Sequence, residues 1–229
     1  MRQLPMRKIC LCPTRRYAKT FNRMKTRWFI LGLAVIAPCS ARAADDLTLT
    51  VREERGEIEI RLRKKPVLVY TFATNQFKPY VRDLFTLRGE NVLRDAPPDH
   101  LHHHGMMYAV YVNGINFWEE KGTPGLQRHI KLQQVGNSDA KGLPAAHFTE
   151  LIHWLAPTNL DTPLLIERRK ITVAVNEDNQ EVAVRWDAQF QAGPKAGTVR
   201  LHGPNYNGLG LRLPESFNHV ARFQNSLEI

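Results

Sequence analysis

The sequence predicts an all-β fold, an antiparallel β-sandwich. Apolar and polar residues alternate in short runs, turn-forming residues separate these runs, and no stretch has the apolar spacing of a long amphipathic helix. Many short strands at close spacing are typical of sandwiches and barrels. The chain contains no internal repeat and no visible domain boundary, and 229 residues are enough to bury one core.

Residues 1–43 are predicted to form a secretory signal peptide that precedes a single domain over residues 44–229. A basic segment leads into the apolar run Trp28–Ala37, and Ala41-Arg42-Ala43 supplies the small residues of a cleavage site. This run is about half as long as the ~20 residues of a membrane-spanning helix. We therefore expect export to the periplasm or the extracellular space. An uncleaved anchor is the alternative, Met24 is an alternative start, and the segment does not decide between Sec and twin-arginine export.

Charge and cysteine content separate this leader from the rest of the chain. The sequence has 32 Lys and Arg against 22 Asp and Glu, but ten basic residues and all three cysteines precede Ala44. The remaining chain is neutral, so it lacks the basic surface of a nucleic-acid binder. Without cysteine it has no disulfide framework, thiolate metal site or cysteine nucleophile. It also has no apolar run long enough for stable membrane insertion after signal cleavage.

The first strands are predicted from alternation. Residues 47–52 and 58–63 each alternate between apolar and polar side chains, which is the pattern of half-buried strands. The short polar link Glu53–Gly56 predicts that these two strands form a hairpin. Pro66 opens a third expected strand, Val67–Phe72.

A second hairpin is predicted around Asn113-Gly114, between the runs Met106–Val112 and Ile115–Trp118. Asn-Gly favours a type I′ turn, which needs positive φ at both positions. Val220–Ile229 is expected to be a strand that stops with the chain, so the sandwich is expected to be truncated at its C-terminus. Further strands are expected at 127–135, 147–155, 164–175, 181–190, 199–202 and 209–213.

The main chemical signal is a cluster of histidines. The segment Asp99-His100-Leu101-His102-His103-His104-Gly105 places four of the nine histidines in five positions, directly after two prolines. Because prolines favour extended backbone, we expect His100, His102 and His104 on one face and His103 on the other. Imidazole ligates zinc, copper and nickel, and it transfers protons near pH 7.

Three interpretations of this cluster stay open. The first is a metal site with His100, His102 and His104 as candidate ligands, although no strong zinc motif is present. The second is an acid–base or sugar-hydroxyl-binding site. The third is a structural role within the loop. Trp118 with Tyr111 offers a stacking floor for a sugar ring, whereas Phe117 is expected to pack in the core.

Two further motifs carry charged or turn-forming residues. In the expected strand 164–175, alternation places Glu167 and Arg169 on one face, which is expected to be solvated unless Glu167 points towards the histidines. The segment Gly203–Arg212 allows tight turns but lacks the pattern of a phosphate-binding loop. Arg212 is expected either to bind a ligand carboxylate or to pair with an acidic side chain.

Four of these segments together resemble a known family. Phe77-Lys78-Pro79-Tyr80, Pro98–Gly105, Val112–Trp118 and Asn207–Arg212 occur in this order. They resemble the PmoA-like family of exported bacterial proteins over about Lys65–Arg222. The family's name refers to a methane oxygenase subunit, but the membrane subunit of that oxygenase has several transmembrane helices, which this sequence lacks.

The resemblance implies a sandwich similar to the galactose-mutarotase type and a carbohydrate-related activity. The expected activity is sugar binding or mutarotase- or epimerase-like proton transfer, which requires no cofactor. The alternatives are a histidine-ligated copper or zinc oxidoreductase and a non-catalytic saccharide-binding module. Family members are longer at the C-terminus, which agrees with a truncated sandwich.

Sugar ring opening needs a general base at the anomeric hydroxyl and a general acid at the ring oxygen. By analogy with the mutarotase type, we expect one histidine among His100, His102 and His103 as the acid and Glu167 as the base. The expected ligand is a small-molecule saccharide. The residues expected to bind it are Asp99, His100, Trp118, Tyr206, Asn207 and Arg212.

Overall fold

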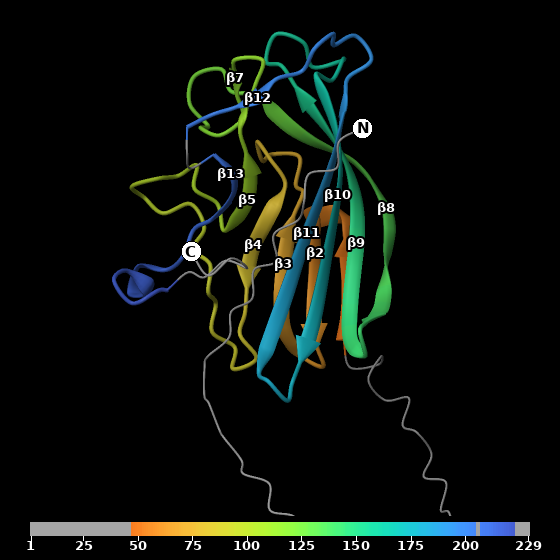
Figure 1. Ribbon diagram of the computed structural model, residues 1–229, viewed down its shortest axis with the longest axis vertical. Coiled ribbons are helices and arrows are strands. Elements are labelled where there is room, and N and C mark those ends of the chain that lie inside the picture. Colours follow the sequence, from red (N-terminus) through yellow and green to blue (C-terminus); the bar gives the residue numbers. More distant parts are fainter. Residues whose placement is uncertain (1–46, 205–206, 223–229) are drawn as a thin grey trace, which may run out of the picture.

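Alternating apolar residues form two antiparallel sheets that pack face to face, as the computed structural model shows for residues 47–204 and 207–222 (Figure 1). The predicted all-β, sandwich-like fold is confirmed. The predicted signal peptide, Tyr206 and most of the expected strand Val220–Ile229 lie outside the described residues. No helix in the described ranges is long and apolar enough to cross a membrane.

The larger sheet has six strands in the order β1-β2-β3-β4-β5-β13. The smaller main sheet has four, in the order β11-β10-β9-β8, and a third sheet joins β12, β6 and β7. The strands of the six-stranded sheet are β1 (Leu47–Arg52), β2 (Glu57–Leu62), β3 (Lys65–Thr71), β4 (Tyr80–Leu84), β5 (Met106–Ala109) and β13 (Gly208–Leu211). The other strands are β6 (Tyr111–Val112), β7 (Ile115–Asn116), β8 (Leu126–Ala140), β9 (Leu143–Leu155), β10 (Leu165–Asn176), β11 (Glu181–Ala192) and β12 (Leu201–His202). Two 3-10 turns, η1 (Glu53–Arg55) and η2 (Glu215–Phe217), complete the described elements.

The main core lies between the two larger sheets. Ile60 and Leu68 from the six-stranded sheet pack in one buried cluster with Phe148 and Ile171 from the four-stranded sheet. A second cluster near one end of the sandwich contains Phe117, which is buried as expected. Burying one face of each sheet is what period-two alternation requires.

Both predicted hairpins are present. The link between β1 and β2 is η1 followed by Gly56 at φ 60°, where an added Cβ would lie 2.5 Å from Ala73 Cα. Asn113 and Gly114 have φ of 50° and 83°, the positive values that a type I′ turn needs. A third hairpin joins β8 to β9 through Lys141 and Gly142, also at positive φ.

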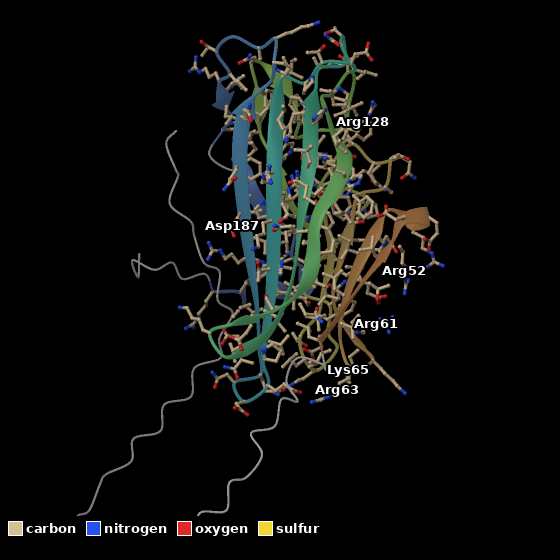
Figure 2. The ribbon with its side chains drawn as sticks, turned by 90° about the vertical axis from the view of Figure 1, so that its right-hand side faces the viewer. Arg52, Arg61, Arg63, Lys65, Arg128 and Asp187 are labelled. Atoms are coloured by element: carbon tan, nitrogen blue, oxygen red, sulfur yellow. The ribbon has the colours of Figure 1, made fainter. Side chains whose placement is uncertain are left out.

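Arginines line the outer hairpin of the six-stranded sheet, where Figure 2 shows Arg52 in β1, Arg61 in β2 and Arg63 just after β2. Arg52 and Arg61 each lie 2.7 Å from a carboxylate oxygen of Glu59. Arg63, in the β2–β3 turn, pairs at 2.9 Å with Glu177 in the β10–β11 turn, so it ties the two sheets together at one end. Charges along β1 and β2 also oppose edge-to-edge pairing with another sheet.

Candidate functional site

Two loops form a pocket that brings together some of the candidate site residues. Residues 98–103, from the connection between β4 and β5, face residues 118–121, from the connection between β7 and β8. The open pocket between them has a volume of about 770 Å³. Its lining includes Asp99, His100 and Trp118, three of the residues that the sequence suggested as ligand-binding.

The histidine loop is folded into turns and is not extended as expected. The His100 amide donates to the Pro97 carbonyl at 2.8 Å, and the His103 amide donates to the His100 carbonyl at 2.9 Å. These turns override the extended preference of the prolines. His100, His102 and His103 therefore line the pocket together, whereas His104 turns inward and is buried. The expected division, with only His103 on the other face, is wrong.

The three pocket histidines form an aromatic cluster with Trp118. The rings of His100 and His103 stack at 4.5 Å between centroids, and His102 meets His103 edge-on at 4.4 Å. The Trp118 ring centroid lies 5.7 Å from that of His103. Burial lowers the pKa of His102, and burial together with the neighbouring His102 lowers the pKa of His103 to about 4. Both imidazoles are therefore neutral at pH 7.

This arrangement does not form the metal site considered from the sequence. Among the described residues, no group of three or more His, Cys, Asp or Glu side chains is placed to hold a metal ion. His104, the third candidate ligand, lies behind the loop with both ring nitrogens facing carboxylates.

A chain of hydrogen-bonded polar side chains, most of them buried, lies directly behind the pocket. His104 Nδ1 is 2.7 Å from Asp95 Oδ1, and His104 Nε2 is 3.0 Å from Glu120 Oε1. The buried Lys78 ammonium donates to the same Glu120 oxygen and to the Trp118 carbonyl. Tyr80 donates to Asp95 at 3.0 Å and stacks on His104 at 4.2 Å.

The hydrogen bonds among these side chains behind the pocket determine which of them are charged. Both ring nitrogens of His104 face carboxylate oxygens, and an ionised carboxylate only accepts hydrogen bonds, so this geometry favours the imidazolium form, in which both nitrogens donate. Burial alone would lower the pKa of His104, but the hydrogen bonds to Asp95 and Glu120 outweigh it and raise this pKa. The pKa of Glu120 is lowered because His104 and Lys78 outweigh the effect of burial. Burial lowers the pKa of Lys78.

Comparison with known proteins assigns a family to this fold and pocket. Residues 57–227 match the model of DUF6807, a family of unknown function. The chain belongs to the DUF6807 family. The expected PmoA-like family is thus wrong, since no model of that family matches. Neither the curated proteins nor the solved structures give a match.

Glu167, which the sequence suggested as the partner base, lies in a buried ion pair of this DUF6807 protein and not beside the pocket histidines. The predicted alternation is correct, since Glu167 and Arg169 share one face, but that face is fully buried and not solvated. Arg169 binds both Glu167 oxygens at 2.7 and 2.8 Å, and Trp154 Nε1 donates to one of them at 2.9 Å. Glu167 does not line the pocket.

Arg169 continues this buried network towards the pocket. It donates to the Pro79 carbonyl at 2.7 Å and to the Tyr70 hydroxyl at 3.0 Å, and it lies 4.4 Å from the Trp186 ring centroid. Pro79 stands between Lys78 and Tyr80, whose side chains belong to the chain behind the pocket. The network in the core of the DUF6807 domain therefore holds a segment that supplies the site.

The other candidate site residues that the structure describes lie outside the pocket lining. Arg212 Nη2 is 3.6 Å from Asp99 Oδ2, which favours the expected pairing with an acidic side chain. Asn207 does not line the pocket. Tyr111 packs on His202, with ring centroids 5.5 Å apart, and does not add to the floor formed by Trp118.

Sequence reasoning assigned no role to several residues of this site. Glu119, Glu120 and Lys121 form a charged run directly after Trp118, and this run is a signal that could have identified them. Lys78 belongs to a segment noted for its resemblance alone. Asp95 carries no local signal, because only the folded connection between β4 and β5 brings it to His104.

Proposed function

We propose that the pocket binds a neutral saccharide. The observation that carries this proposal is that Trp118, three imidazoles and several carboxylates line one open pocket. The imidazoles are those of His100, His102 and His103. Its volume of about 770 Å³ falls within the roughly 300–1,000 Å³ that is usual for small-molecule sites.

The chemistry of the lining matches that of a sugar. A sugar ring has apolar C–H faces and a rim of hydroxyl groups. Trp118 offers an aromatic face for the former. Neutral imidazoles such as those of His102 and His103 each offer one donor and one acceptor to hydroxyls, while Glu119 and Glu120 offer acceptors.

Binding is better supported than proton-transfer catalysis. An efficient general acid or base has a pKa near the working pH. The pKa of His103 lies at about 4, and the pKa values of His102 and Glu120 are also lowered. His104 has a raised pKa but is buried and bound on both nitrogens.

Mutarotase-like proton transfer is the second candidate, because imidazoles and carboxylates line one pocket. In that case Glu120 replaces Glu167 as the carboxylate.

We further propose that the protein acts after export, in line with the leader expected at residues 1–43, on saccharides outside the cytoplasm.

The first test measures saccharide binding by calorimetry with a panel of neutral oligosaccharides. Replacing Trp118 by Ala is expected to weaken binding at least tenfold, or about 1.4 kcal/mol, because the stacking face is lost. Tyr111→Ala is the matched control, since Tyr111 is an aromatic residue outside the pocket. Equal affinity of both variants and the parent protein for every ligand, or no binding at all, refutes the proposal.

A second assay separates binding from catalysis. Polarimetry with freshly dissolved glucose and galactose measures the rate of mutarotation. We expect a rate close to that of buffer. A large acceleration that His103→Gln abolishes would instead establish the acid–base alternative.

A further inference from the structure

We propose that Glu120 is the carboxylate that meets the ligand in the pocket, and that Lys78 and His104 are positioning residues that hold it there. This inference rests on the proposed saccharide binding and names the group that would accept a ligand hydroxyl. It follows from the position of Glu120, which both belongs to the hydrogen-bonded side chains behind the pocket and lines the pocket itself.

Glu120 is the point of contact between these two parts of the molecule. It is the one member of the buried chain whose side chain lines the pocket, as far as the described residues show. Its side chain is 16% exposed, whereas that of His104 is 5% and that of Lys78 is 2% exposed. A ligand in the pocket can therefore reach Glu120 but not the two cations behind it.

The two oxygens of Glu120 have different partners. Lys78 and His104 both donate to Oε1. Within the described residues Oε2 accepts no hydrogen bond, although an ionised carboxylate can accept about four. Since partly buried carboxylates normally satisfy their oxygens, Oε2 is the acceptor that a ligand hydroxyl would use.

The positioning groups are themselves fixed. Asp95 holds the far nitrogen of His104, Tyr80 stacks on the ring, and the Trp118 carbonyl takes a second hydrogen bond from Lys78. With two cations on one oxygen, Glu120 is fixed as an acceptor and cannot donate. The site should therefore prefer hydroxyl or ammonium donors, as in neutral and amino sugars, over carboxylates of uronic acids.

The first arm of the test reports on the positioning groups without any ligand. Nitrogen-15 NMR of the imidazoles should show that His104 carries two N–H groups and loses one of them only above the ordinary imidazole pKa of about 6.5. Glu120→Gln should lower the midpoint of its titration, and Glu119→Gln, a neighbouring pocket carboxylate, should leave it unchanged. A neutral His104 in the parent protein, or equal midpoints in both variants, would overturn the positioning roles.

The second arm measures affinity for the best neutral oligosaccharide of the panel and for its uronic-acid counterpart. Glu120→Gln should weaken binding of the neutral ligand at least tenfold. The control Glu90→Gln, at an exposed carboxylate outside the pocket, should weaken it less than threefold. Lys78→Met should weaken binding of the neutral ligand severalfold, and Lys78→Arg should retain the parent affinity. This pair of variants also tests the inference if Glu120→Gln fails to fold. Unchanged affinity in Glu120→Gln or Lys78→Met, or a preference for the uronic acid, would overturn this inference and leave saccharide binding intact. Failure of the parent protein to bind any saccharide would overturn both.

Discussion

The adjacent residues His103 and His104 have pKa values shifted in opposite directions because their surroundings differ. His103 is partly buried beside other imidazoles, which lowers its pKa to about 4, whereas His104 lies between Asp95 and Glu120, which raise its pKa. Histidine titrations followed by NMR should therefore give a midpoint near pH 4 for His103 and one above the usual value of about 6.5 for His104. Coinciding midpoints would contradict the separate environments described for the two rings.

These shifts predict opposite effects on stability. The folded pKa of His103 lies below its unfolded value of about 6.5. Its titration therefore lowers the free energy of unfolding as pH falls from about 6.5 towards 4. The folded pKa of His104 is raised. Protonated His104 therefore adds to the free energy of unfolding below about pH 6.5, and this stabilisation is lost as pH rises through the folded pKa. In urea unfolding, His103→Gln should flatten the acid limb and His104→Gln the alkaline limb. The same pH dependence in both variants would refute this assignment.

At the scale of elements, β10 links the core to the site through Arg169. Removing one partner of a buried ion pair typically costs about 3–5 kcal/mol, because the other charge stays buried. Arg169→Met should reduce the free energy of unfolding by this amount, since it leaves Glu167 without its guanidinium partner. Arg168→Met, an exposed neighbour on the same strand, should change it by about 0.5 kcal/mol or less. Equal effects in urea unfolding would remove the case for a network that stabilises the fold.

Most strands could be predicted because alternation is a local signal. Residues 181–190 fall within β11, and residues 58–63 are one residue out of step with β2. β4 was missed, since Tyr80–Leu84 is short and follows a proline-containing segment whose structure depends on Arg169.

The site was only partly predictable, for a related reason. Local composition identified the histidines and Trp118, but hydrogen bonds decide which way each histidine faces. His104 meets Asp95 nine residues before it and Glu120 sixteen residues after it, and Lys78 comes from a third segment. No periodic pattern encodes such encounters, and Glu167 was misplaced because charged residues in strands are usually solvated.

At the scale of the whole molecule, the folded domain begins before the stretch that defines the family. The DUF6807 match starts at residue 57, yet β1 (Leu47–Arg52) pairs along its whole length with β2. Leu47 is 1% exposed within the main core, and Asn137 in β8 donates to its carbonyl at 2.9 Å. β1 thus joins both sheets of the sandwich, and its loss should be felt by the entire fold.

This role of β1 can be tested with a single truncation of a side chain. Leu47→Ala should lower the free energy of unfolding by about 2–5 kcal/mol, because it removes buried methyl groups and leaves a cavity. For a domain of this size, each kcal/mol corresponds to roughly 2–4 °C in Tm. Val220→Ala is the control, since Val220 is 68% exposed and its truncation removes little buried apolar surface. If thermal unfolding gives the two variants the same Tm, β1 lies outside the cooperative unit and the family stretch folds without it.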